Sequence, residues 1–106
     1  MTAFSDPASN PLARQSVTAS VRLRHEAGLH ARPAVKLTKL AKKFASKISL
    51  AISVEGPWID AKSIVKLMGA KTPRDSLLVF RAEGADAQAA VDALVSLVER
   101  DFPDEP

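Results

Sequence analysis

The sequence predicts a single α+β domain in which a four-stranded antiparallel sheet carries three helices on one face, in the order βαββαβα. Apolar residues alternate with polar residues in several short segments, which is typical of strands that bury one face. In other segments, apolar residues recur every three or four positions, as they do in amphipathic helices. The connection "EGP" is short, which favours an antiparallel hairpin. One sheet with helices on one face would bury every apolar stripe in the chain.

The first part of the chain contains a tail, a strand and a helix. Residues 1–15 hold two prolines and no apolar period, so we expect a disordered tail. Alternation over residues 17–23 predicts the first strand. Helical periodicity extends over residues 31–44, and the helix must begin near Ala31 because Pro33 is tolerated only in a first turn. The apolar stripe of this helix consists of Leu37, Leu40, Ala41 and Phe44.

A hairpin and a short helix are predicted next. Alternation of apolar residues over 48–54 predicts the second strand, and "WID" at 58–60 forms a short third strand after the turn. Ser63 is a suitable N-cap for a short helix over residues 63–68.

The last part of the chain is predicted to form a strand and a long helix. Residues 76–82 alternate, with Leu78, Phe80 and Ala82 on one face. Asp86 is the expected N-cap of the final helix. The apolar stripe of that helix consists of Ala87, Ala90, Val91, Leu94 and Val98. The predicted domain therefore covers residues 16–102, and residues 103–106 form a C-terminal tail.

Composition excludes several classes of function. The 106 residues are 46% hydrophobic and 25% charged, with a formal net charge of +3, which is ordinary globular composition. No apolar run is long enough for a transmembrane helix and no secretory signal is present, so we expect a cytoplasmic protein. Without cysteine, a disulfide framework and a cysteine nucleophile are excluded. No metal site is expected, because the two histidines, His25 and His30, lack helical ligand spacing.

The segment "GLHARPA", residues 28–34, carries the strongest chemical signal. His30 directly precedes the predicted helix, whose first amides lack intrahelical partners and whose N-terminus carries partial positive charge. Such an N-terminus suits a phosphate, and Arg32 adds a cation that holds phosphoryl oxygens in a forked geometry. The positive end disfavours imidazolium, and a neutral imidazole is a nucleophile. These features predict a transient phosphohistidine. The alternative is that His30, like His25, is an ordinary surface residue.

Two segments resemble one known family. "GLHARPA" resembles the active-site signature of the histidine-containing phosphocarrier (HPr) proteins of the bacterial sugar phosphotransferase system. "DAKSIVKLM", residues 60–68, resembles the regulatory-serine segment of the same family. Two motifs at a compatible separation are much more specific than one. The resemblance covers about residues 16–102 and implies the family's open-faced β-sandwich.

The resemblance implies a role for each residue around the predicted helix start. His30 would accept a phosphoryl group on Nδ1 from phosphorylated enzyme I, whose own donor is phosphoenolpyruvate. It would pass that group to an enzyme II A component. Arg32 would stabilise the phosphoryl charge, the backbone amides of Ala31 and Arg32 would form the phosphate nest, and Gly28 would allow the turn. The chain would then be a phosphoryl-transfer protein with a phosphohistidine intermediate rather than an independent enzyme. No cofactor is expected, and we expect a monomer that forms transient complexes.

The second segment implies regulation and docking. Ser63 would be phosphorylated by a serine kinase, with a matching phosphorylase, or it would merely cap its helix. Ile64, Val65 and Met68 are expected to dock partners, with Leu67 in the core and Val65 and Met68 exposed. The nearby lysines would steer acidic partners; they are Lys36, Lys39, Lys42 and Lys43.

Some features depart from the family pattern. Ala27 stands where many members have a polar residue, often asparagine, and the turn around Pro57 is longer than usual. The sequence therefore leaves open whether the relay serves sugar uptake, nitrogen-related regulation or a dihydroxyacetone kinase. A second hypothesis is a regulatory partner controlled mainly through Ser63. A third is a nucleic-acid-binding domain that uses the basic helix, against which stand the single Trp and the absence of Tyr.

Overall fold

We describe the protein from a computed structural model, which defines residues 16–24, 28–53, 55–70 and 72–103. The elements follow the predicted order. They are β1 (Ser16–Arg22), α2 (Ala31–Ala41), β2 (Lys47–Ala51), β3 (Ile59–Asp60), α3 (Ile64–Gly69), β4 (Leu77–Glu83) and α4 (Ala87–Glu99). The predictions for the N-terminal tail, His25, Ala27 and residues 104–106 lie outside the described residues.

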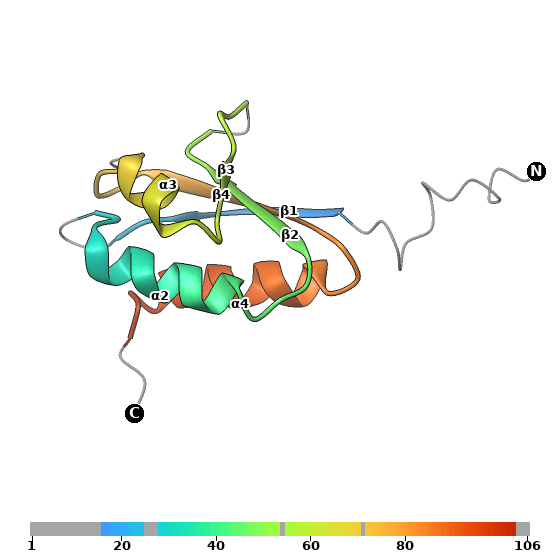
Figure 1. The fold of residues 1–106 in the computed structure, drawn as a ribbon. Coiled ribbons are helices and arrows are strands. Elements are labelled where there is room, and N and C mark those ends of the chain that lie inside the picture. The colour runs from blue at the N-terminus through green and yellow to red at the C-terminus, as the bar shows by residue number, and fades with distance from the viewer. Residues whose placement is uncertain (1–15, 25–27, 54, 71, 104–106) are drawn as a thin grey trace, which may run out of the picture.

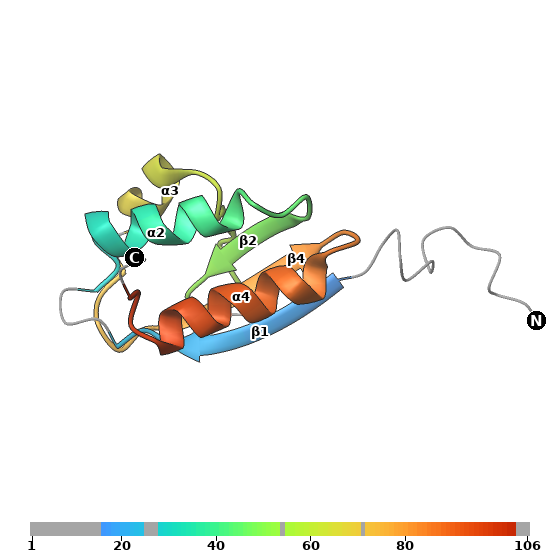
Figure 2. The same ribbon diagram turned by 90° about the horizontal axis from the view of Figure 1, so that it is seen from below.

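The four strands form one antiparallel sheet in the order β1-β4-β2-β3, which confirms the predicted fold class. The central strand β4 pairs with β1 on one side and β2 on the other, so that Phe80 lies opposite both Ala19 and Leu50. The long helices α2 and α4 lie side by side across one face of the sheet (Figures 1 and 2). The short helix α3 packs beside α2, near β3.

The core lies between the sheet and these helices, as the sequence predicted. Leu78, Phe80 and Ala82 of β4 are fully buried. The predicted stripe of α4 is buried throughout, from Ala87 to Val98. Burial of large aliphatic side chains is the main favourable term in folding, so this contact surface holds the sheet and helices together.

Three predicted elements, α2, β2 and β3, are shorter in the structure than the sequence suggested. Helix α2 ends at Ala41 rather than residue 44, because the amides of Lys43 and Phe44 bond three residues back, to Leu40 and Ala41, in tight turns. Phe44 still packs against the core.

The second strand ends at Ala51 rather than at residue 54. The predicted alternation fails because Ala51 is buried on the outer face of the sheet, whereas Ile52 is 51% exposed. The turn begins directly afterwards, and the Gly56 amide donates to the Ser53 carbonyl (3.0 Å). The third strand contains only Ile59 and Asp60.

The predicted capping role of Asp86 is wrong in its details. Asp86 stands at the N-cap of α4, but its side chain makes no cap hydrogen bond. Its carboxylate instead accepts the amides of Ala45 (2.8 Å) and Ser46 (2.9 Å), together with the Ser46 hydroxyl. These bonds, the Ser46 hydroxyl first, hold the pKa of Asp86 below its ordinary value. Asp86 therefore fixes the α2–β2 loop to the start of α4.

Candidate functional site

His30 stands at the N-cap of α2, as the sequence predicted. Its backbone is extended (φ −98°, ψ −160°), and its carbonyl accepts the Ala34 amide (2.9 Å) in the first bond of the helix. Its side chain makes no capping bond to its own helix and is half-buried. The next positions, Ala31 and Arg32, are first-turn residues whose amides have no acceptor within an α-helix. Pro33 follows them and has no amide hydrogen, so it fits this turn without loss.

The turn before His30 requires glycine. Gly28 has φ +75°, in the left-handed region, and a Cβ there would lie 2.6 Å from the Thr72 carbonyl oxygen and 3.1 Å from the Arg74 nitrogen. The Leu29 amide donates to that same Thr72 carbonyl (2.9 Å), and the Leu29 side chain is buried. The segment before α2 thus packs against residues 72–74 and the core, which fixes the position of His30.

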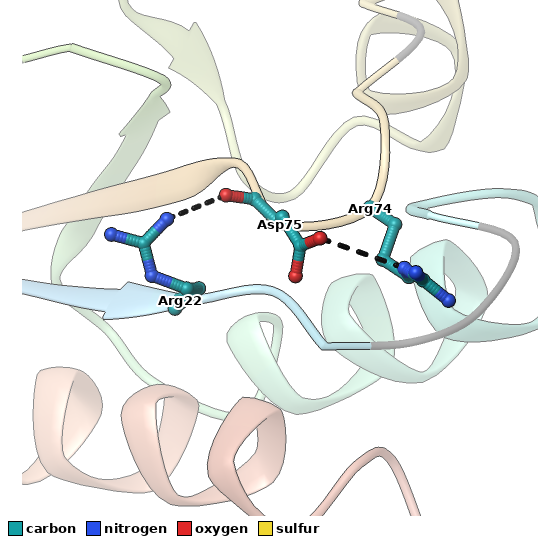
Figure 3. A network of polar contacts seen from close by, with 3 residues as sticks. All are labelled: Arg22, Arg74 and Asp75. Atoms are coloured by element: carbon teal, nitrogen blue, oxygen red, sulfur yellow. Dashed lines mark hydrogen bonds and ion pairs between the residues drawn. The ribbon is translucent and has the colours of Figure 1, made fainter.

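The segment that supports Gly28 is itself held in place (Figure 3). Arg22 donates from Nη1 to the Asp75 carbonyl (2.7 Å), and the Asp75 amide donates to the Leu23 carbonyl (2.7 Å). The Arg74 Nε lies 3.6 Å from the Asp75 carboxylate, and both side chains are more than half exposed. Because exposed pairs contribute little to stability, Arg74 adds surface charge rather than rigidity.

The sequence did not predict the contact between the Gly28 turn and the backbone of Arg74. Arg74 is far from His30 in the chain, and no spacing rule connects them. Only the close packing of Gly28 on the Arg74 backbone brings the two segments together. Arg32, which the sequence did single out, is exposed on the first turn of α2.

Helix α3 places the second predicted group of residues. Ser63 is its N-cap, and the Ser63 Oγ accepts the Lys66 amide (3.3 Å). Leu67 is fully buried, whereas Val65 is 77% and Met68 is 40% exposed, as the sequence predicted. Ile64 is only partly exposed and packs against the core.

Helices α2 and α3 pack against each other, and both carry exposed apolar residues. Helix α3 lies beside the N-terminal half of α2 in both views (Figures 1 and 2). Farther along α2, the buried Thr38 hydroxyl donates to the carbonyl of Ala61 (3.3 Å), in the connection between β3 and α3. Val35 of α2, which the sequence analysis did not single out, is 43% exposed. We call Val35, Val65 and Met68 the α2–α3 rim. Exposed apolar side chains next to a charged site are typical of a surface that binds other proteins.

Comparison with known proteins identifies related chains. Residues 17–100 match the family model described as "PTS HPr component phosphorylation site". The phosphocarrier protein HPr of Cupriavidus necator is 40% identical over 75 residues, which cover 71% of this chain and 82% of the relative. A multiphosphoryl transfer protein of Vibrio cholerae is 39% identical over 85 residues, which cover 79% of this chain but only 21% of that relative. The chain thus spans about a fifth of the length of that larger protein.

A solved structure agrees with the fold. The crystal structure of HPr-C-His from Thermoanaerobacter tengcongensis matches with a TM-score of 0.76 at 32% identity, and the match covers 85% of this chain and 99% of that one. None of the helices in the described part of the chain is long and apolar enough to cross a membrane.

Proposed function

The chain belongs to the HPr family of phosphocarrier proteins of the phosphotransferase system, and we propose that His30 is the residue that carries the phosphoryl group. The observation that supports this most is the position of His30. It stands at the N-cap of an eleven-residue helix, held by the packing of Gly28 on Thr72. A helix N-terminus favours anions through its amides and its dipole.

The transfer step needs positioning more than a catalytic apparatus. The Nδ1 lone pair of neutral His30 attacks the phosphorus of a donor phosphohistidine, so that one N–P bond forms while the donor N–P bond breaks. The electron pair of the broken bond returns to the donor imidazole. The three phosphoryl oxygens then lie against the amides of Ala31 and Arg32 and the Arg32 guanidinium. Phosphoryl transfer is accelerated mainly by such alignment and charge stabilisation.

The partners of this relay are proposed from the family. The donor is phosphorylated enzyme I, charged by phosphoenolpyruvate, and the acceptor is an enzyme II A component or a dihydroxyacetone kinase relay, all in the cytoplasm. The α2–α3 rim gives partners exposed apolar side chains to contact. The exposed lysines Lys39, Lys42 and Lys43 raise the rate of encounter with acidic partners.

Regulation through Ser63 is the second candidate function. Ser63 directly precedes α3, two residues before the exposed Val65. A phosphoserine there would add nearly two negative charges beside the α2–α3 rim. Those charges would oppose docking of acidic partners. If Ser63 is a regulatory site, Ser63→Glu lowers the rate of phosphoryl transfer to His30, and Ser63→Ala leaves that rate unchanged.

The test of the carrier role is a mass measurement. We would incubate the protein with a cognate, active enzyme I, Mg²⁺ and phosphoenolpyruvate and record its intact mass. The expected result is one acid-labile phosphoryl adduct, which is absent from His30→Ala and present in Ser63→Ala. No adduct on the unmodified sequence, or an equal adduct on His30→Ala, would refute the proposal and give first place to the regulatory role.

A further inference from the structure

The outer face of the sheet carries a hollow that the phosphocarrier role does not use. This face is opposite α2 and α4, and the hollow lies at its β2–β3 edge, with a volume of about 440 Å³. The side chains of its lining that carry the argument are Lys47, Ser49, Trp58, Asp60, Lys62 and Arg81.

Arg81 is held in position by an aromatic ring. Its neighbours in β4, Phe80 and Ala82, are fully buried in the core, so the Arg81 side chain points to the outer face. Its guanidinium carbon lies 4.0 Å from the centroid of the Trp58 ring. This cation–π contact orders the guanidinium before any ligand arrives, which lowers the entropic cost of binding. Trp58 itself is only partly covered.

The strand register explains why a hollow exists here. Arg81 pairs with Ser49, and Ser49 pairs with Asp60, so the three residues form one row across β4, β2 and β3. Adjacent strands are about 4.8 Å apart, which puts the backbones of Arg81 and Asp60 roughly 10 Å from each other. Ser49 therefore forms the floor between them. The Asp60 carboxylate accepts the Lys62 amide (2.9 Å) instead of pairing with Arg81.

The cations of the hollow outnumber the carboxylates on the same face of the sheet. Among the described residues, no carboxylate forms an ion pair with Lys47, Lys62 or Arg81. Lys62 donates from Nζ to the Phe44 carbonyl (2.7 Å), a contact that leaves its charge in place. Glu83 lies opposite Lys47 in the β2–β4 register and on the same face as Arg81, so the three positive charges face two carboxylates, those of Asp60 and Glu83, and one positive charge is in excess. Such a cluster attracts an anionic group of a ligand.

We propose that this hollow binds a small phosphate monoester with a hydroxylated body. The planar fork of Arg81 matches phosphate oxygens, and Lys47 adds a second positive charge. Ser49 and the remaining lone pairs of Asp60 accept hydroxyl hydrogens, and the uncovered part of Trp58 gives an apolar contact. The volume lies within the range of sites for small molecules. A ligand that is charged along its whole length, such as a nucleic acid, is disfavoured because it would meet the Asp60 carboxylate.

The site is separate from His30. The hollow includes Ala45 and Ser46, which follow the C-terminal end of α2, whereas His30 stands at the N-terminal end. Eleven helical residues span about 16 Å. Binding in the hollow therefore neither needs nor blocks the phosphorylation of His30.

The chain offers a built-in reporter for the test, because Trp58 is its single tryptophan and it has no tyrosine. We would titrate the unphosphorylated full chain with ribose 5-phosphate and follow Trp58 emission, with calorimetry in parallel. The expected result is a saturable change with ribose 5-phosphate and none with ribose. Lys47→Gln, which does not touch the ring, should weaken binding about fivefold. Arg81→Gln, measured by calorimetry, should weaken it about tenfold or more.

Lys39→Gln is the matched control, because it removes one exposed lysine charge from α2, across the sheet from the hollow. It should bind ribose 5-phosphate as the unmodified chain does, and so should His30→Ala. Three results would overturn the proposal: no saturation by either method, equal weakening in Lys47→Gln and Lys39→Gln, or equal affinity for sulfate. Saturation by a glutamate-rich peptide but not by ribose 5-phosphate would also overturn it, in favour of an acidic protein partner.

Discussion

Replacement of Gly28 by alanine tests how the fold positions His30. Gly28 has φ +75°, and the Cβ of an alanine at this position would lie 2.6 Å from the Thr72 carbonyl oxygen. That oxygen belongs to the backbone and accepts the Leu29 amide (2.9 Å), so it cannot move away without loss. Gly28→Ala should therefore destabilise the protein and displace His30 together.

The magnitude follows from two contributions. An L-residue in the left-handed region costs about 1–2 kcal/mol. Relief of the close contact weakens the hydrogen bond between Leu29 and Thr72, which costs about 0.5–1.5 kcal/mol more. The free energy of unfolding should thus fall by about 1.5–3.5 kcal/mol. For a domain of this size, each kcal/mol lowers Tm by about 4–8 °C.

Chemical denaturation measures the loss of stability, and the rate of phosphorylation by enzyme I measures the displacement of His30. Gly69→Ala is the matched control, because nothing lies within 4 Å of its Cβ position at the end of α3. That variant should be neutral or slightly stabilised, since alanine favours helix more than glycine does. If the unfolding free energy of Gly28→Ala lies within about 0.5 kcal/mol of that of the unmodified protein, the packing of Gly28 on Thr72 does not limit this position.

Three further predictions concern the core, the charges and pH. Leu67→Ala should lower the free energy of unfolding in urea by about 2–5 kcal/mol, because Leu67 is fully buried. The exposed Val65→Ala should change it by less than about 0.5 kcal/mol. Equal effects would contradict the assignment of the α3 faces. Arg32→Gln should slow phosphorylation of His30 about tenfold or more, and the exposed Arg100→Gln should not, in a single-turnover assay. The lowered pKa of Asp86 stabilises the folded protein above the unfolded pKa of 3.8, and this stability is lost as pH falls through the folded pKa. The loss of Tm caused by Asp86→Asn should therefore be largest near neutral pH and should disappear in acid. A loss of Tm that does not depend on pH would refute this.

The sequence predicted the structure correctly where the decisive interaction is local or repeats along one helix or strand. Each buried stripe predicted for β4 and α4 is buried in the structure, because periodicity of two or 3.6 residues reports burial of one face directly. The helix start after His30 was also predictable, because Pro33 leaves only one place for the first turn. Ser63 caps α3 as predicted, through a contact three residues along the chain.

The sequence was insufficient where the decisive partner is distant along the chain. Asp86 is a residue type that favours N-caps, but its carboxylate accepts the amides of Ala45 and Ser46 instead of an amide of its own helix. Gly28 was predicted to allow a turn, whereas its contact with Thr72 depends on how two loops meet. The alternation predicted over residues 48–54 breaks at Ala51, which is buried on the outer face through tertiary packing that no local period encodes.

The separation of the His30 turn from the hollow determines whether the effects of variants at these two sites on unfolding free energy should add. The His30 turn depends on Gly28 and the 72–74 segment, whereas the hollow depends on the contact between Trp58 and Arg81, so different residues hold the two sites in place. Effects of sites that are more than 7–10 Å apart and share no partner usually add within about 0.5 kcal/mol. The double variant Gly28→Ala/Arg81→Gln should therefore lose the sum of the two single losses in unfolding free energy. A coupling energy well above that limit would mean that the sheet transmits strain between the two sites, and would contradict their independence.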